Sequence, residues 1–242
     1  LLLMIKKFIL GSVLMLIGAV VTNAQGIVVG TGATLHINGA ANLVINNGGL
    51  SNSGTFIPGT GTVTLTGTAL SSSTSLSGTS PISFYNLGVN KTAGSARLLR
   101  NTSITNNLLF TNGNIDLNGF DIDLGSTGSL VGESALSTVV GLSGGSINRT
   151  ISLNAPTNVN PGNIGIEITS TANLGLTTIK RGQSQQVNSS GFSINRYFDV
   201  IPTNNTGLNA TIKMYYQDAE LAGVNENELK LWSKPVAANV LW

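Results

Sequence analysis

The sequence predicts an all-β chain in which a right-handed parallel β-solenoid, or β-helix, is followed by an antiparallel β-sandwich-like domain. Apolar and polar residues alternate over very short segments, as at Val63 and Leu65, which is typical of strands with one buried face. Leu108, Ile115 and Ile122 begin successive strands of this kind, seven residues apart. Three such strands make a coil of about 21 residues, a repeat length found in solenoids, whose coils bury their apolar side by stacking.

Asn-Gly pairs separate the short segments and mark the expected corners of the coils. Both residue types adopt left-handed backbone angles at low cost. The pairs are Asn38-Gly39, Asn47-Gly48, Asn112-Gly113 and Asn118-Gly119. With this phase, we expect Leu108, Ile115, Ile122 and Leu124 to point into the interior of the solenoid.

The composition excludes several classes of protein. The 242 residues include 30 Gly, no Cys and only 9% charged residues, and 41% are hydrophobic. A chain without cysteine has no disulfide scaffold, no thiol catalysis and no Cys-based zinc site. Low charge and ample hydrophobicity argue against a coiled coil and against a charged disordered tail.

The N-terminus has the layout of a signal peptide. Lys6 and Lys7 precede an apolar run over residues 8–21, and small residues follow up to Ala24. We expect residues 1–24 to form a helical leader that is cleaved between Ala24 and Gln25. The apolar run is shorter than the ~20 residues that span a bilayer, so the mature chain is expected to have no membrane span.

The mature chain is also expected to carry no net charge. The whole chain has 12 basic and 10 acidic residues, and removal of Lys6 and Lys7 with the leader leaves equal numbers of each. The remaining basic residues are scattered along the chain. Nucleic acid is therefore not an expected partner, because binding it needs a clustered basic face.

The regular pattern of short strands and turns changes near residue 145. Longer strand candidates follow, punctuated by Pro156 and Pro161, and most aromatic residues of the chain lie after residue 190. We expect a solenoid over 25–145 and a sandwich-like domain over 146–242, truncated because the chain stops within an apolar string. The strand candidates are Ile147–Leu153, Ile164–Ile168, Arg196–Ile201, Ala210–Tyr216 and Leu229–Trp232.

Four strings carry a family resemblance: FYNLGVNK at 84–91, NTSITNNLLFTNGNIDLNGFDIDLG at 101–125, NLGLTTIKRG at 173–182 and NRYFDVIPTNNTGLNATIKMYYQDAEL at 195–221. With these strings the chain resembles secreted β-helical surface proteins of the Bacteroidota lineage. Such proteins pair a filamentous-haemagglutinin-like β-helix with a β-sandwich and are exported by type IX secretion. The resemblance implies an extracellular, adhesin-like or structural protein, and the C-terminal sorting domain of that group is expected beyond residue 242.

Candidate metal and proton-transfer residues are few. His36 alternates with Leu35 and Ile37, which places it on the outer face of an early strand. The string over residues 114–119 resembles the start of an EF-hand loop, but Gly125 stands where the closing Glu belongs. Two strands joined by an Asn-Gly corner explain this string better. A weak surface Ca²⁺ contact between Asp121 and Asp123 is left open, and no cofactor or metal site is predicted.

A glycan-cleaving enzyme needs facing carboxylates, often with Arg or Lys beside them. The solenoid carries its acids late in the stack, and two arginines lie about one coil earlier, so one polar stripe is conceivable. The acids are Asp116, Asp121, Asp123 and Glu133, and the arginines are Arg97 and Arg100.

The second half offers two further candidates. Arg181, Arg196, Asp199 and Lys213 are its notable charges, and a structural ion pair is their expected role. The aromatic residues Tyr215, Tyr216 and Trp232 either fill a small core or form a candidate ligand surface that stacks on sugar rings.

The sequence therefore favours a non-catalytic exported surface protein, adhesin-like or a structural stalk for attachment or extracellular matrix. Surface glycans or other extracellular proteins are the expected partners. The alternatives are a carbohydrate-active β-helix enzyme of the polysaccharide lyase or hydrolase type, and a carbohydrate-binding module of a larger secreted protein. No catalytic residue is assigned.

Overall fold

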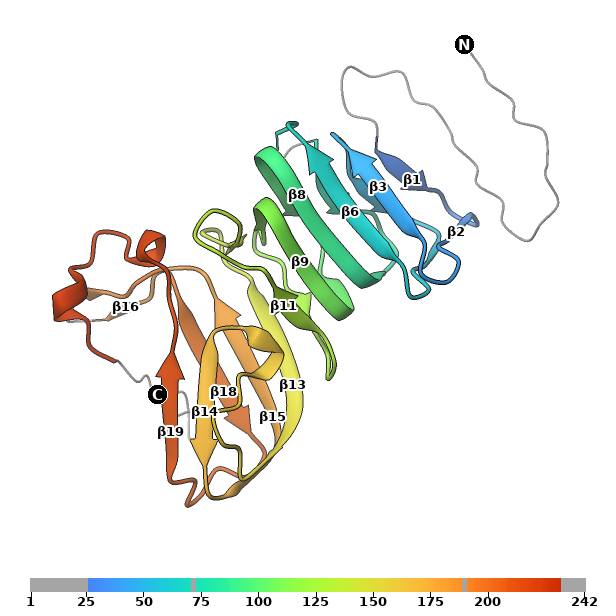
Figure 1. Cartoon of the computed structure of the whole chain (residues 1–242). Coiled ribbons are helices and arrows are strands. Elements are labelled where there is room, and N and C mark those ends of the chain that lie inside the picture. Colours follow the sequence, from blue (N-terminus) through green and yellow to red (C-terminus); the bar gives the residue numbers. More distant parts are fainter. Residues whose placement is uncertain (1–25, 71–72, 189–190, 232–242) are drawn as a thin grey trace, which may run out of the picture.

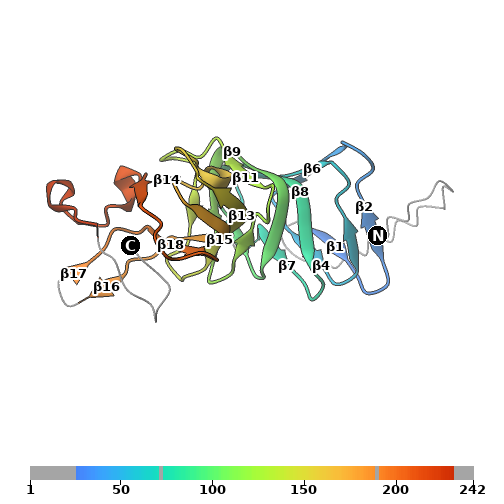
Figure 2. The ribbon, with the colours of Figure 1, turned by 90° about the horizontal axis from the view of Figure 1, so that it is seen from below.

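The computed structural model of the chain describes residues 26–70, 73–188 and 191–231. The expected leader helix, the Ala24–Gln25 cleavage site and Trp232 lie outside these ranges. The described chain is all-β, and its first part is a parallel β-solenoid of about 5 turns. The coils stack from β1 to β11, and the antiparallel strands follow at the other end (Figures 1 and 2). The right-handed winding stays a prediction.

Each coil contributes strands to three faces of the solenoid, and strands on the same face pair in parallel. The first face contains β1 (Ile27–Val29), β4 (Leu50–Asn52), β7 (Ser75–Ser77), the ends of β8 (Ile82–Leu98) and β9 (Thr102–Asp116), and β12 (Val139–Val140). The second contains β3 (Asn42–Asn46), β6 (Thr62–Gly67), the middle of β8 and β9, and β11 (Ser129–Val131). The third contains β2 (Thr34–His36) and β5 (Thr55–Ile57), which within the described ranges pair only with each other, and then the starts of β8 and β9, β10 (Ile122–Asp123) and the start of β13 (Ser146–Asn154).

The length of a coil follows from the strand register on the second face. Leu43 pairs with Val63, Val63 with Leu87, Leu87 with Leu108 and Leu108 with Leu130, so one coil takes 20 to 24 residues. The expected coil of about 21 residues is therefore close to the structure.

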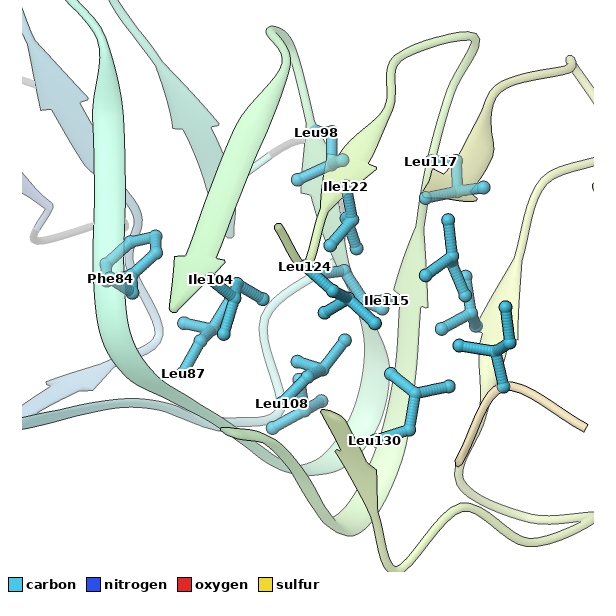
Figure 3. Packing of buried hydrophobic residues seen from close by; sticks show 14 of the residues in the cluster. Phe84, Leu87, Leu98, Ile104, Leu108, Ile115, Leu117, Ile122, Leu124 and Leu130 are labelled. Atoms are coloured by element: carbon cyan, nitrogen blue, oxygen red, sulfur yellow. The ribbon is translucent and has the colours of Figure 1, made fainter. Parts of the chain in front are cut away.

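The predicted strand phase is confirmed. Leu108, Ile115, Ile122 and Leu124 are fully buried in the solenoid interior (Figure 3). The first three lie on three different faces of one coil and pair with Leu130, Val139 and Ile147 of the next coil. Removal of such apolar side chains from water, about 25 cal/mol per Å² buried, stabilises the stack.

The corners depend on residues that accept unusual backbone geometry. In each of the four Asn-Gly pairs at least one residue has a positive φ, for example 50° at Asn118. Gly49 is required because of close packing between coils: a Cβ atom there would lie 2.0 Å from the carbonyl oxygen of Ser75 on the next coil. A side chain at Gly49 would therefore push two coils apart.

The interior also holds a lysine. Lys91 follows Leu87 and Val89 on the inward side of β8 and is 1% exposed. Its Nζ donates a hydrogen bond of 3.0 Å to Oγ1 of Thr74, which is fully buried too. Burial lowers the pKa of the Lys91 ammonium group, because its charged form loses solvation.

The second half is antiparallel. β13, β15 (Asn173–Gly182) and β18 (Tyr197–Pro202) form one sheet, and β14 (Ile166–Ser170) pairs with β19 (Ala210–Met214). β16 (Val187–Asn188) and β17 (Gly191–Phe192) pair antiparallel, and the described ranges also contain three 3₁₀ turns: η1 (Pro161–Asn163), η2 (Asp218–Glu220) and η3 (Glu226–Glu228). The sandwich stays a prediction. The expected strand over Leu229–Trp232 is wrong for its described part, since residues 229–231 have no strand structure.

The two halves share one strand. β13 pairs in parallel with β10 of the last coil and antiparallel with β15, so a single hydrogen-bonded sheet runs from β1 to β18. The domain limit expected between residues 145 and 146 falls directly before this strand. Pro161, the first residue of η1, and Ile164, which follows η1, are buried, and Asn163 donates from Nδ2 to the carbonyl of Leu130, 3.0 Å away. The η1 segment therefore packs against the last coil.

Replacement of Ile115 by Asp tests the strand phase. Ile115 is fully buried, so the new carboxylate would be placed in an apolar interior, at an expected loss of about 3 to 5 kcal/mol in the free energy of unfolding. Thr111→Asp on the same strand is the control, because Thr111 is exposed and should change stability by no more than about 0.5 kcal/mol. Denaturant melts in which both variants unfold like the wild type would contradict the assigned phase.

Candidate functional site

A row of amide and hydroxyl groups runs along the second face of the solenoid. Asn42, Thr62, Asn86, Asn107 and Ser129 occupy equivalent positions on successive coils. Neighbouring strands lie about 4.8 Å apart, so these groups repeat at that spacing along the axis.

Hydrogen bonds link this row from coil to coil. Asn86 donates from Nδ2 to Oγ1 of Thr62 (3.2 Å), and the neighbouring Asn106 donates from Nδ2 to Oδ1 of Asn86 (2.8 Å). Ser129 donates from Oγ to Oδ1 of Asn107, 3.0 Å away. Such links hold the side chains in place, and each amide keeps further donors and acceptors for solvent or a ligand.

A second group of polar residues lies on the first face, where β8 and β9 end. Arg97 and Asp116 are partners in the strand register, and Nε of Arg97 lies 3.6 Å from Oδ2 of Asp116. Arg97 also donates from Nη2 to Oδ1 of Asn118, whose backbone N–H binds Oδ1 of Asp116 at 3.0 Å. The structure thus unites two residues of the conceivable polar stripe, while Arg100 binds the carbonyl of Gly78 (2.8 Å) instead.

The other sequence candidates on the solenoid are engaged in local structure. Asp121 accepts hydrogen bonds at Oδ1 from the backbone N–H (2.8 Å) and the hydroxyl (2.9 Å) of Ser146. Asp123 accepts from the backbone N–H of Gly125 at 2.8 Å. His36 is exposed at the end of β2, as expected. Within the described ranges, no three His, Cys, Asp or Glu side chains gather as a metal site would need.

The strongest electrostatic feature lies where the solenoid meets the antiparallel sheet. Arg181 of β15 is fully buried and binds Glu133 of the last coil through two hydrogen bonds, Nη1 to Oε2 (2.7 Å) and Nη2 to Oε1 (2.6 Å). Nη1 also donates to the carbonyl of Ile164, 3.1 Å away. Oε1 of Glu133 further accepts from the hydroxyl of Thr138 (2.7 Å) and the backbone N–H of Val139 (3.2 Å).

The pKa of Glu133 reflects a competition between burial and the interactions of its carboxylate with Arg181 and Thr138. Burial alone raises the pKa, because it disfavours the carboxylate. The charge of Arg181 and the hydrogen bonds from Arg181 and Thr138 outweigh burial, and the pKa falls to about 2. Glu133 is therefore ionised throughout the neutral range and has the role of a structural anion rather than a general acid.

A second buried ion pair lies beside the first. Arg196 donates from Nη2 and Nε to Oε1 of Glu220, at 2.6 and 3.1 Å, and from Nη1 to the carbonyl of Tyr215 at 2.8 Å. Burial lowers the pKa of Arg196, as does the charge of Arg181, whereas Glu220 and Glu133 oppose this shift. Two guanidinium groups and two carboxylates therefore form one cluster, with Glu133 as its member from the solenoid.

Sequence reasoning predicted a structural ion pair among the charges of the second half but missed the carboxylates that form it. Glu133 lies 48 residues before Arg181, and Glu220 lies 24 residues after Arg196. Of the other two charges, Asp199 pairs with Lys180 in the strand register, and burial raises the Asp199 pKa against the charge of that lysine. Lys213 lies over the ring of Tyr215, 5.1 Å from its centroid.

The two described aromatic residues of the candidate ligand surface bind different carboxylates. The hydroxyl of Tyr215 donates to Oε2 of Glu167 (2.9 Å), and that of Tyr216 donates to Oε1 of Glu226 (2.6 Å). Both bonds are exposed. A shared platform of these two rings with Trp232 stays a prediction.

Comparison with known proteins identifies no relative: no family model, no curated protein and no solved structure matches the chain. In the part of the chain that the structure describes, no helix has the length and apolarity that a bilayer crossing requires.

A double-mutant cycle tests the buried pair at the junction. Glu133→Met leaves the guanidinium of Arg181 buried without its carboxylate, and Arg181→Met leaves the carboxylate without its guanidinium; for each we expect a loss of about 3 to 5 kcal/mol in the free energy of unfolding. Glu133→Met combined with Arg181→Met removes both charges and should cost less than either single change. Additive losses in denaturant melts would show that the two side chains do not interact.

The low pKa of Glu133 also predicts a pH dependence. The carboxyl group has an ordinary pKa of 4.5 and a folded-state pKa of about 2, so its stabilisation is fully present above pH 4.5 and is lost as the pH falls towards 2. Over this window the wild type should lose about 3 kcal/mol more than Glu133→Gln, which cannot titrate. Parallel unfolding curves of the two proteins between these pH values would contradict the assignment.

Proposed function

We propose that this chain is a non-catalytic exported surface protein. Its β-solenoid serves as a stalk and carries the attachment surface along one of its faces. The observation that supports this role most strongly is the unbroken sheet from β1 to β18. Hydrogen bonds between strands run along the axis of such a stack, and the buried Arg181–Glu133 ion pair holds its last coil to the antiparallel half. A spacer needs this kind of resistance to bending at the joint.

The proposed binding surface is the row of amides and hydroxyls on the second face. These groups donate and accept hydrogen bonds without a net charge, which suits the hydroxyl-rich surface of a glycan or another extracellular protein. The signal-like leader and the resemblance to secreted β-helical surface proteins of the Bacteroidota type support export and an extracellular location. Type IX secretion is part of the same proposal.

One alternative has an observation of its own. Arg97 and Asp116 meet on the first face, so a carbohydrate-active β-helix enzyme would have a cation and a carboxylate on adjacent coils. The engagement of Asp116 by both Arg97 and the backbone of Asn118 favours a structural role. A carbohydrate-binding module, which the sequence left as a second alternative, has no comparable observation.

The proposal predicts attachment without cleavage. Purified mature protein should be retained on beads that carry members of a panel of extracellular glycans and matrix proteins. His36→Ala, and separately Asp121→Ala with Asp123→Ala, should leave retention unchanged. Soluble polysaccharides incubated with the protein should yield no new reducing ends or unsaturated products. Release of such products by the wild type, lost in Arg97→Ala or Asp116→Asn, would overturn the non-catalytic proposal in favour of the enzyme.

Export is tested separately. When the chain is expressed with its own leader in a secreting bacterial host, mass spectrometry of the exported protein should find an N-terminus at Gln25. Retention of the whole chain inside the host, with Lys6 and Lys7 still present, would contradict export.

A further inference from the structure

The four Asn-Gly corners of the solenoid fall into two structural classes. At Asn47 and Asn118 the asparagine itself has a positive φ, 56° and 50°. In Asn38-Gly39 and Asn112-Gly113 only the glycine has a positive φ, 56° and 75°. The fold therefore places identical dipeptides in different backbone conformations, and their side-chain amides have different surroundings.

In the first class an adjacent coil holds the amide. Oδ1 of Asn47 accepts hydrogen bonds from the backbone N–H groups of residues 68 and 69, at 2.6 and 2.8 Å. Asn118 donates from Nδ2 to the carbonyl of Leu98 at 3.0 Å, and its Oδ1 accepts from Nη2 of Arg97. These bonds fix both amide groups in place, so Asn47 and Asn118 are called the held corners.

In the second class the amide faces solvent. Asn38 and Asn112 are exposed, and within the described ranges no adjacent coil holds their amides as it holds those of the first class. Asn38 and Asn112 are therefore called the open corners. A Cβ atom at Gly39 would meet no other atom within 4 Å, so there is free space around the first of them. Asn112 is more restrained, because it belongs to β9 and pairs with Asn90 of β8.

An unrestrained Asn-Gly pair undergoes a reaction with its own backbone. The deprotonated glycine nitrogen attacks Cγ of the asparagine, and glycine has no side chain to hinder the approach. The new N–Cγ bond closes a succinimide ring, the Cγ–Nδ2 bond breaks, and Nδ2 leaves as ammonia with the proton. Water then opens the ring to aspartate or isoaspartate. The amide must rotate towards the next backbone nitrogen, and hydrogen bonds to another coil oppose this rotation.

We infer that the open corners Asn38 and Asn112 are sites of spontaneous deamidation in the folded protein, whereas the fold protects the held corners Asn47 and Asn118. Asn38 should react faster than Asn112, because it lies outside the strands. This modification does not depend on the proposed role in attachment.

Each event changes both charge and backbone. One carboxylate replaces a neutral amide, and at Asn112 it would stand in register with Asn90 and Thr66 of the second face. Isoaspartate also adds a methylene group to the main chain. Coils of 20 to 24 residues already differ in length, so an open corner can accommodate this addition.

The four corners can be compared in one sample. The full chain would be incubated at mildly alkaline pH in heavy-oxygen water, once folded and once in denaturant, and its peptides analysed by mass spectrometry. Heavy oxygen marks each ring that water has opened, and the rate in denaturant gives the intrinsic reactivity of each site. In the folded chain Asn38 should react close to its denatured rate and Asn112 more slowly. Asn47 and Asn118 should react at least about tenfold more slowly than when denatured, because their reaction needs local opening.

Arg97→Ala provides a second measurement. It removes the hydrogen bond to Oδ1 of Asn118, so this corner should react faster than in the wild type. Asn47 in the same sample is the matched control, and its unchanged slow reaction would show that the variant is still folded.

Equal protection of all four corners, or faster reaction of the held corners than of the open ones, would overturn the inference. Open corners that stay intact in the folded chain while the denatured chain reacts would overturn it as well. An unchanged rate at Asn118 in Arg97→Ala would contradict protection by hydrogen bonding.

Discussion

Every backbone N–H and C=O group inside a stack of coils needs a hydrogen-bond partner, and in this protein the next coil supplies most of these partners. This constraint explains why the solenoid cannot stop at an arbitrary residue. Its last coil would present a row of unpaired groups and an uncovered apolar interior. β13 resolves the first difficulty, because it pairs in parallel with β10 on one side and turns the pairing antiparallel with β15 on the other. The η1 segment covers part of the interior.

The change from parallel to antiparallel pairing places charges in the interior of the junction. Arg181 is fully buried, and the free energy lost when a guanidinium leaves water is offset here by two short hydrogen bonds to Glu133 and one to a carbonyl. An apolar pair of similar size could pack as well, so the ion pair is better understood as a device for specificity. A sheet slipped by one residue along β15 would turn Arg181 to the other face and separate it from Glu133.

The sequence predicted the interior of the solenoid well, because the relevant pattern is local. Ile115 and Ile122 follow Leu108 at a fixed step, and Asn-Gly pairs mark corners through their own backbone preferences. The junction could not be predicted in the same way. Glu133 and Arg181 are 48 residues apart, and no periodicity connects a coil with a strand of a different sheet.

Three further features could not be predicted, for related physical reasons. Lys91 interrupts an apolar row, and its burial depends on Thr74 from a different face of the solenoid. Residues 229–231 alternate like a strand, but alternation does not supply a partner, and within the described ranges they pair with no strand. Tyr215 and Tyr216 are adjacent in sequence, and only the positions of Glu167 and Glu226 determine which carboxylate each hydroxyl binds.

The variable coil length has a consequence for how such a chain can change in evolution. Coils of 20 to 24 residues keep Leu43, Val63, Leu87, Leu108 and Leu130 in one aligned column, so the difference in length is absorbed at the corners. Small insertions at a corner therefore leave the ladder intact. Duplication of an entire coil would lengthen the molecule by one strand spacing, about 4.8 Å, while the junction with β13 keeps its contacts. The reach of the protein could thus be adjusted in steps of one coil, independently of the surface it presents.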